Sequence, residues 1–363
     1  MSAEERSSEG REKPPRGEPS PSERSPARER LSSRLRNAVA HLAWPLGALA
    51  LLLAFNACFT PGFFALELRD GRLYGTLVDV LNHGAKLGIV ALGMTLVIAT
   101  GGVDLSVGAT MAISGAIAAT LAVHHGASLG MIVACTTAFG LFAGAWNGVL
   151  VAVFRIQPIV GTLVLMVAGR GIAQLVTDGM IVTFDHPGLA FLAGGSVLGL
   201  PFPVTLVVLA LVALALILRR TALGLFVEAV GDNETASRYA GLDARGVTLF
   251  AYAACGLCAA CAGLIEASYI KAADANNAGL FVELDAILAV VIGGTALTGG
   301  RFFLVGSLCG ALFIECLTKT MYMRDVSADI APVPKAIVVV LVCALQSPVL
   351  RDWTGRAWKR GRA

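Results

Sequence analysis

Charged residues are scarce in this chain of 363 residues. They make up 15% of the sequence, while hydrophobic residues make up 56% and the mean hydropathy is +0.74. A soluble domain usually contains about 25% charged residues. The scarcity excludes an ordinary soluble domain and favours an all-α, polytopic membrane protein.

A phosphate-binding loop of the form G-x-x-x-x-G-K-[ST] is also missing from the sequence. The glycine-rich run GGTALTGG (293–300) has no lysine that could reach a phosphate, so its glycines are better explained as a helix break. The chain therefore has no ATPase motif of its own, and any ATP-driven motor has to lie on another subunit.

Residues for metal or acid–base chemistry are few. The five histidines are scattered, and no nucleophile–base pair is apparent. Cys255, Cys258 and Cys261 have a metal-like spacing, but no histidine or fourth cysteine completes a site. In GLCAACAG (256–263) they are better explained as small residues that let membrane helices pack closely. We therefore expect no metal site and no enzyme activity.

Long apolar stretches dominate what is present. A membrane span needs about 20 mostly apolar residues, and about ten such stretches can be counted. They cover residues 39–60, 76–99, 105–123, 128–153, 158–177, 203–218, 247–268, 283–297, 303–320 and 333–347. This pattern predicts one transmembrane domain over residues 38–350.

The two ends of the chain are polar. Residues 1–37 are rich in Ser, Pro, Arg and Glu and contain no apolar run, which predicts a disordered tail and not a signal peptide. Residues 351–363 form a second, basic tail. Arginines lie just before the first span and after the last, and positive charge near span ends prefers the cytoplasm. Both termini are therefore expected in the cytoplasm, as an even number of spans requires.

One polar segment interrupts the apolar pattern in the middle of the chain. It reads LFVEAVGDNETASRYAGLDAR (225–245) and follows Arg219 and Arg220, which mark the cytoplasmic end of the preceding span. Its sequence indicates a short helix with a break at each end. We interpret it as a docking element for a soluble partner, although an inert loop remains an alternative. The candidate docking residues are Glu228, Gly231, Asp232, Asn233, Glu234, Arg238 and Gly241.

Two glycine motifs flank apolar spans. In ATGGVDLSVGA (99–109), Asp104 and Ser106 are good N-cap types for a helix that begins near Val107. The motif is either a capped helix start or an opened turn beside a translocation path. Gly101 and Gly102 match Gly293 and Gly294 in a similar pattern 192 residues later. Paired glycine-interrupted segments in the two halves of a transporter can mark such a path.

Charged side chains also lie inside apolar stretches, where an ionisable group is a functional hypothesis by default. They are Asp79, Lys86, Arg170, Glu266, Glu283, Asp285 and Glu315. Arg170 lies between two glycines, so a structural ion pair, a substrate contact and a helix kink are all open. The candidate path residues are Gly101, Gly102, Asp104, Ser106, Arg170, Asn276, Asn277, Glu283, Asp285, Gly293 and Gly294.

The segment Asp274–Asn277 carries amide and carboxylate groups that could hydrogen-bond the hydroxyls of a sugar. A generic outer loop would have the same composition, so both interpretations stay open.

Three long motifs in this order resemble a known family. GGVDLSVGA, EAVGDNETASRYAGLD and ELDAILAVVIGGTALTGGRFFLVGSLCGAL resemble the permease subunits of bacterial ABC sugar importers of the ribose type. The resemblance covers roughly residues 40–350. Residues 146–176 and 273–294 look most like the galactofuranose-type permeases.

The resemblance implies a type II-like permease of about ten helices in the bacterial inner membrane. Two such subunits, identical or paralogous, would sit over a pair of ATPase subunits that bind ATP and Mg²⁺. A periplasmic binding protein would deliver a monosaccharide of the ribose, galactofuranose or galactose kind. Residues 226–241 would be the coupling helix, and Glu228, Gly231, Asn233 and Gly241 coincide with the family's pattern there. A nucleic-acid partner is not expected.

Two other functions remain as alternatives. An ion-coupled secondary sugar transporter would use Asp104, Arg170 or Glu315 as its ion site. A branched-chain amino acid permease of the ABC class would share the fold, although the wording GGVDLSVGA favours sugar.

Overall fold

The computed structural model describes residues 26–69, 72–197, 200–327 and 330–346. The chain divides into two units, residues 1–41 and 42–363, and the description below concerns the second. Eight of the described helices are long and apolar enough to cross a membrane. They are α1 (Pro26–Phe59, apolar from Leu42), α2 (Thr76–Ala99), α3 (Val107–His124), α4 (Leu129–Ala152), α5 (Pro158–Val176), α7 (Phe202–Arg220), α10 (Ala244–Ile270) and α12 (Leu304–Tyr322).

Shorter elements complete the described chain. The short helices are α6 (Pro187–Gly194), α8 (Leu223–Asp232), α9 (Glu234–Tyr239), α11 (Val282–Ile292) and α13 (Pro332–Gln346). Three antiparallel strand pairs join β1 (Glu67–Arg69) to β2 (Arg72–Tyr74), β3 (Val182–Thr183) to β6 (Ala272–Ala273), and β4 (Ser196–Val197) to β5 (Leu200–Pro201).

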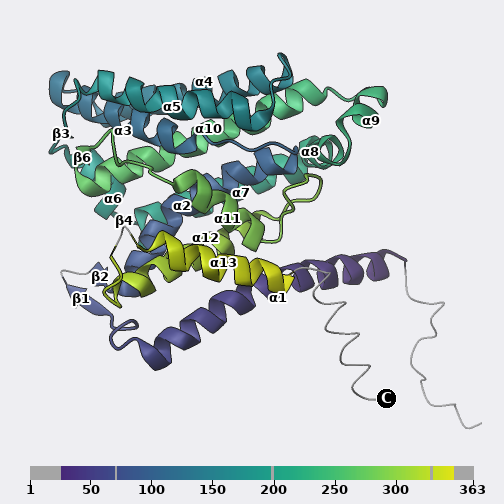
Figure 1. Cartoon of the computed structure of the whole chain (residues 1–363), viewed down its shortest axis with the longest axis horizontal. Coiled ribbons are helices and arrows are strands. Elements are labelled where there is room, and N and C mark those ends of the chain that lie inside the picture. Colours follow the sequence, from purple (N-terminus) through teal and green to yellow (C-terminus); the bar gives the residue numbers. More distant parts are fainter. Residues whose placement is uncertain (1–25, 70–71, 198–199, 328–329, 347–363) are drawn as a thin grey trace, which may run out of the picture. The chain divides into compact units, whose positions relative to one another are not determined.

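The helices of the second unit form packed layers. In Figure 1, α3, α4, α5 and α10 lie together above α2, α7, α11 and α12. The helix α2 is the most buried of the long helices, because its segment LGIVALGMTLVIA (87–99) is apolar or small on every face. It packs on α10, α12 and α11 at once. Because α2 is enclosed by these helices, its two ends are fixed in position within the bundle.

Small residues set the distances between these helices. Gly140 and Gly144 of α4 lie against the backbone of α10 around Gly256. A Cβ atom on Gly93 of α2 would lie 2.8 Å from the Cα of Cys255. Cys255 and Cys258 are both buried there, so their interpretation as packing residues is confirmed.

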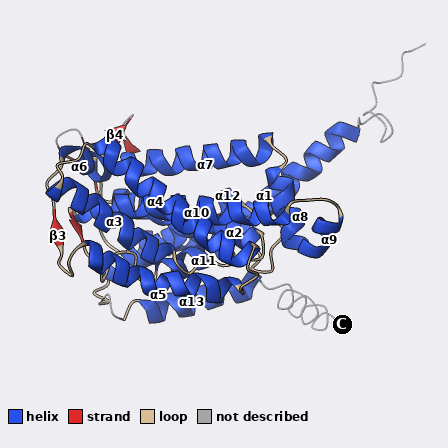
Figure 2. Ribbon diagram, turned by 90° about the horizontal axis from the view of Figure 1, so that it is seen from above, coloured by secondary structure: helices blue, strands red, loops and turns tan. Residues whose placement is uncertain are grey.

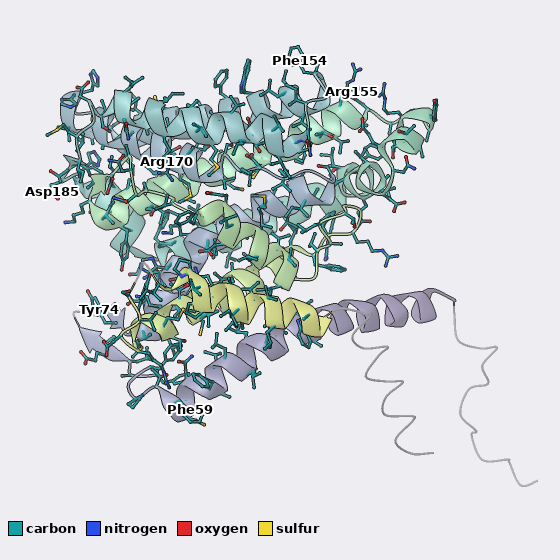
Figure 3. All side chains as sticks on the ribbon, in the orientation of Figure 1. Phe59, Tyr74, Phe154, Arg155, Arg170 and Asp185 are labelled. Carbon is teal, nitrogen blue, oxygen red and sulfur yellow. The ribbon has the colours of Figure 1, made fainter. Side chains whose placement is uncertain are left out.

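Two ends of the helix bundle can be distinguished. Figure 2 shows α8 and α9 at one end, and α6, β3 and β4 at the other. We call these the α9 end and the strand end. Figure 3 shows Arg155 at the α9 end and Tyr74 and Asp185 at the strand end.

The ten predicted spans all coincide with helices, and the all-α polytopic fold is confirmed. Two of these helices are shorter than the about 20 residues of a full membrane span. The predicted span 283–297 is α11, which has 11 residues and stops at Gly293 and Gly294. Gly294 has a φ of +91°, a left-handed conformation that glycine adopts without strain. The last predicted span is α13, with 15 residues.

The first predicted boundary differs from the structure. Residues 26–37 were expected in a disordered tail, yet α1 already begins at Pro26. The segment RERLSSRLRNAVA is rich in Arg, Leu and Ala, which favour a helix that continues from the apolar span. Residues 1–25 and the predicted basic tail 351–363 lie outside the described residues.

Candidate functional site

The predicted docking segment forms an exposed surface at the α9 end. Here α8 and α9 replace the single short helix that was predicted, because the chain is extended at Asn233. The Asn233 side chain accepts a hydrogen bond from the Ala236 N–H at 2.9 Å and so caps α9. Residues 232–236 and 238–241 are all exposed. We call residues 232–241 the α9 surface.

One strongly exposed aromatic side chain on this surface was not singled out from the sequence. Tyr239 is 90% exposed at the end of α9. A fully exposed tyrosine is unusual on a protein surface, and tyrosine is enriched in interfaces with other proteins. The α9 surface therefore has an aromatic anchor beside the charges of Asp232 and Arg238.

Glycine contacts fix α8 against the rest of the protein. A Cβ atom on Gly231 would lie 1.8 Å from the Ala99 oxygen and 2.5 Å from the Gly300 nitrogen. The Gly300 N–H in turn donates to the Ala99 C=O at 2.9 Å. Three segments far apart in the sequence thus meet through their backbones: the end of α8, the end of α2 and the loop before α12.

Apolar side chains support the same junction. Val227 and Val230 of α8 are buried with Ala99, Ala244 and Val247. Glu228, on the next position of α8, is partly buried. The helix α8 therefore buries one face against these residues of α2 and α10 and exposes the other.

A polar hollow of about 290 Å³ lies behind the α9 surface. Its walls come from the loop after α2, the α4–α5 turn and the start of α10. The lining includes Thr100, Gly101, Gly102, Arg155, Gln157, Glu234, Arg238, Arg245 and Tyr252. Gly101 and Gly102 thus lie beside the predicted docking residues, a proximity that their separation in sequence did not reveal.

Asp104 and Ser106 form a buried polar cluster with a residue that the sequence did not single out. One oxygen of Asp104 accepts hydrogen bonds from the Ser106 N–H at 2.9 Å and the Ser106 hydroxyl at 2.7 Å. Asn147 of α4 donates to the same oxygen at 3.3 Å and to the Ser106 hydroxyl at 2.7 Å. Ser106 occupies the N-cap position of α3, but its side chain makes no capping hydrogen bond. The expected capping role is therefore replaced by a link between α3 and α4.

The Asp104 carboxyl is buried, and the two residues that hydrogen-bond to it, Ser106 and Asn147, carry no charge. Burial raises its pKa above the ordinary aspartate value, and the hydrogen bonds from Ser106 and Asn147 oppose that rise.

The second group of predicted residues lies near the strand end. Arg170 of α5 donates to the backbone oxygens of Ala275 at 3.2 Å, Asn276 at 3.4 Å and Ala278. The helix α5 runs unbroken from Pro158 to Val176, so the Gly169–Gly171 stretch is not a helix break. Figure 3 shows Arg170 among the helices. Its guanidinium donates to backbone carbonyl groups, and these partners were not expected from the sequence.

Further contacts hold the segment 274–281 in place. Gln174, one turn after Arg170, donates to the Asn276 side chain at 2.6 Å. Asp274 accepts hydrogen bonds from the backbone N–H groups of Asn276 and Asn277 at 3.0 and 3.2 Å. These bonds fold the segment into a compact turn against α5. Gln174 could have been found from its i+4 spacing on the face of Arg170.

The segment 274–281 reaches the start of α3. A Cβ atom on Gly108 would lie 2.3 Å from the Gly279 oxygen and 2.5 Å from a carboxylate oxygen of Glu283. Glu283 is only 3% exposed. Asp285 pairs instead with Lys335 of α13 at 2.9 Å. The short helix α11 is therefore joined to both α3 and α13 through residues of its first turn.

The predicted path residues do not form one cluster. Gly101 and Gly102 belong to the α9 end, Asp104 and Ser106 to the α3–α4 link, and Arg170, Asn276, Asn277 and Glu283 to the 274–281 region. Gly293 packs on Gly306 of α12, where a Cβ atom would lie 2.5 Å from backbone atoms.

An apolar helical bundle with a short interrupted helix and an exposed polar element between spans is the architecture of a membrane permease. A family profile described as "Branched-chain amino acid transport system / permease component" matches residues 76–345. The chain belongs to this family, within its ribose-type branch of ABC importer permeases. The predicted family is thus confirmed, and the chain is a multi-pass transport subunit of the inner membrane.

Individual relatives cover most of the chain. The galactofuranose transporter permease protein YtfT of Escherichia coli (strain K12) is 50% identical over 84% of this chain and 90% of the relative. The fructose import permease protein FruF of Bifidobacterium longum is 38% identical over 89% and 92%. The ribose import permease protein RbsC of Escherichia coli (strain K12) is 37% identical over 81% and 90%. No solved structure matches the chain at a significant level.

Proposed function

We propose that this chain forms one half of the membrane path of an ATP-driven importer for a monosaccharide. A separate ABC ATPase would bind ATP and Mg²⁺ and dock on the α9 surface. A second permease subunit, identical or paralogous, would complete the path, and a periplasmic binding protein would deliver the sugar at the strand end. Both termini would then lie in the cytoplasm.

The observation that carries this proposal is the α9 surface and its rigid mounting. Nine of its ten residues, all except Ser237, are exposed, yet α8 is locked to α2 through Gly231 and Ala99. An exposed polar helix on a flexible linker would move alone when a partner pushes it. Because α8 shares a backbone contact with α2, a push on α9 would move the central helix of the bundle.

The 274–281 region is the proposed sugar side of the path. Asn276 and Asn277 are exposed there, and Asp274 and Gln174 complete a set of amide and carboxylate groups. Such groups suit the hydroxyls of a sugar, since each can donate or accept more than one hydrogen bond. The short helix α11 behind them resembles the discontinuous helices that surround transporter binding sites.

The choice of a sugar rests on the individual relatives. Three of them are named for galactofuranose, fructose and ribose, whereas the family profile is named for branched-chain amino acids. The 50% identity to a galactofuranose permease favours a galactofuranose-like monosaccharide.

The test is reconstitution with and without the partner subunits. The permease, the ATPase and the binding protein of the same gene cluster are placed in proteoliposomes, and uptake of labelled galactofuranose, ribose and galactose is measured. We expect uptake only with internal ATP and with all subunits present. Uptake by the permease alone, driven by an ion gradient, would replace the proposal with ion-coupled secondary transport.

Tyr239→Ala tests the docking surface directly. The side chain is fully accessible, so its removal should leave the fold unchanged but weaken ATPase binding about tenfold, a typical effect for an aromatic interface anchor. Tyr322→Ala is the matched control, because Tyr322 is exposed at the other end of the bundle. Equal ATPase affinity in both variants, measured by co-purification and by titration in nanodiscs, would exclude the α9 surface as the docking site.

A further inference from the structure

An apolar groove runs along the side of the bundle between α1, α12 and α13. It has a volume of about 380 Å³, in the range of small-ligand sites. Its walls are formed by Trp44, Gly47, Ala48, Leu51, Leu52 and Phe55 of α1, Phe313 of α12, and Val338, Leu341 and Val342 of α13. We call it the α1–α13 groove.

The groove exists because α1 carries small residues where α13 passes. A Cβ atom added to Gly47 would meet no atom within 4 Å. Leu51 and Leu341 on the two sides are 73% and 57% exposed. An apolar gap without atoms inside loses dispersion energy along its whole lining. In a bilayer, such a gap is filled from the surrounding hydrocarbon.

One face of α1 packs on the core through Ala48, Leu49 and Leu52, and Asn56 adds polar contacts to α12. Asn56 donates to the Thr320 hydroxyl at 2.8 Å, and its other contacts are Leu52 and Cys316. The apolar part of α1 is otherwise largely exposed. An occupant of the groove would therefore provide much of the packing between α1 and α13.

A cationic side chain lies at one end of the groove. The guanidinium of Arg324 lies 5.2 Å above the ring of Phe55, which is itself a groove residue. Arg324 also donates to the Phe59 backbone oxygen at 2.7 Å and is exposed. A guanidinium has five N–H donors in a planar fork that fits a phosphate. The other N–H groups of the Arg324 guanidinium lie at the level of the lipid headgroups, because the apolar span ends at Phe59.

The dimensions of the groove match one acyl chain. From Trp44 to Phe55 the helix rises about 16 Å at 1.5 Å per residue. This is about half of the ~30 Å hydrocarbon core of a bilayer, the depth of a single leaflet. A helix of a partner protein is about 10 Å across and would need several times the available volume.

We propose that the α1–α13 groove binds one phospholipid, with an acyl chain along the groove and the phosphodiester of its headgroup on Arg324. The lipid acts as a structural wedge that packs α13 against α1. This site is separate from the α9 surface and from the 274–281 region, so it does not depend on which sugar is carried.

Trp44 makes the site measurable, because bromine atoms on an acyl chain quench tryptophan fluorescence at contact. A variant with Trp146, Trp353 and Trp358 replaced by Phe keeps Trp44 as the only tryptophan. It is purified in micelles of a maltoside detergent, which carries no phosphate, and titrated with brominated phosphatidylethanolamine or with brominated diacylglycerol, which also has no phosphate. We expect saturable quenching at low fractions of the phospholipid, and quenching by diacylglycerol only in proportion to its fraction.

Two substitutions separate headgroup from chain. Arg324→Gln should weaken the apparent phospholipid affinity about tenfold, the effect of losing one charge-assisted hydrogen-bonded pair. Gly47→Leu should fill the groove and abolish saturable quenching, and the open space at Gly47 lets the fold accept it. Arg220→Gln and Leu46→Phe are the controls, since both residues are exposed and neither lines the groove.

The outcomes decide the proposal. Saturable quenching that disappears in Gly47→Leu and weakens in Arg324→Gln supports it. Equal quenching by the phospholipid and the diacylglycerol would overturn the headgroup assignment. Quenching that follows bulk lipid fraction in every variant would overturn the site itself, because Trp44 would then contact only exchanging lipid. Relief of quenching by inorganic phosphate would show that Arg324 binds free anions and not a lipid.

Discussion

At the α9 end the segments of this protein meet through their backbones, whereas near the strand end side-chain hydrogen bonds are added to a backbone contact between Gly108 and Gly279. Gly231, Ala99 and Gly300 approach so closely that no Cβ atom fits between them. Around the 274–281 segment, Arg170 and Gln174 provide the contacts as donors to that segment. Backbone contacts cannot be released without moving a helix, while side-chain hydrogen bonds can break and reform locally. We therefore expect a rigid junction at the α9 end and a junction that can open locally around the 274–281 segment.

The strand end carries more evidence of this second kind. Lys319 pairs with Asp79 at 3.1 Å, Lys86 with Glu266 at 3.5 Å and Lys335 with Asp285 at 2.9 Å. The predicted intramembrane charges Asp79, Lys86, Glu266 and Asp285 thus serve in ion pairs between helices. This accounts for charges that would otherwise be costly in a membrane.

The largest effect is expected when a side chain at Gly231 disrupts the backbone contact at the α9 end. Gly231→Leu places a side chain where the Ala99 oxygen lies 1.8 Å from the Cβ position, so α8 must move away from α2. We expect a loss of about 3 kcal/mol or more, as for severe overpacking, and abolished uptake. Thermal unfolding in detergent and ATP-dependent uptake measure both.

The control for this change is Gly241→Leu on the same surface. Gly241 has open space around it and a φ of +84°, so a side chain there costs backbone strain of about 1 kcal/mol but no collision. If the two variants were equally stable, the backbone junction at Gly231 would not carry the rigidity that we assign to it.

An intermediate effect is expected where Arg170 and Gln174 hydrogen-bond to the 274–281 segment. Arg170→Met keeps the length of the side chain but leaves the oxygens of Ala275 and Ala278 without this donor. A buried group that loses its partner costs about 1–3 kcal/mol. Here this cost lowers the free energy needed to open the 274–281 segment locally. Hydrogen exchange of residues 274–281 should become faster, while the α9 end keeps its protection.

Lys271→Gln is the matched control for Arg170→Met, because it removes a cation at the same end whose pair with Asp185 is exposed and 3.9 Å long. Such a pair contributes little. Unchanged exchange of the 274–281 segment in Arg170→Met would show that Gly108 and Gly279 alone hold it.

The smallest effect is expected between the two ends, at Asp104. Its folded-state pKa is raised by burial, so folding favours the protonated form. The associated stability is present at low pH and is lost as the pH rises through the raised value. Asp104→Asn keeps an oxygen for Ser106 and Asn147 but cannot ionise. We expect equal or slightly higher thermal stability, with this part of the pH dependence removed; a large destabilisation would show that the charge itself is needed.

The sequence was informative where chemistry is local. The exposed polar element between the spans could be predicted because a polar run between two apolar spans has few structural explanations. Its division into α8 and α9 was missed, although Asn233 is a good N-cap type, because a break depends on how Gly231 is packed. Asn147 and Lys335 were missed since a single polar residue in an apolar run does not reveal which helix it faces.

The sequence by itself determined the membrane class, the approximate number of apolar helices, the absence of a phosphate-binding loop and the family, because these depend on composition, run length and motif order. Only the tertiary structure decided that Gly231 joins α2 and the loop before α12, that Arg170 serves backbone oxygens, and that α11 stops half way. Those properties depend on distances between segments up to about two hundred residues apart, and periodicity along one helix contains no information about the helix that lies beside it.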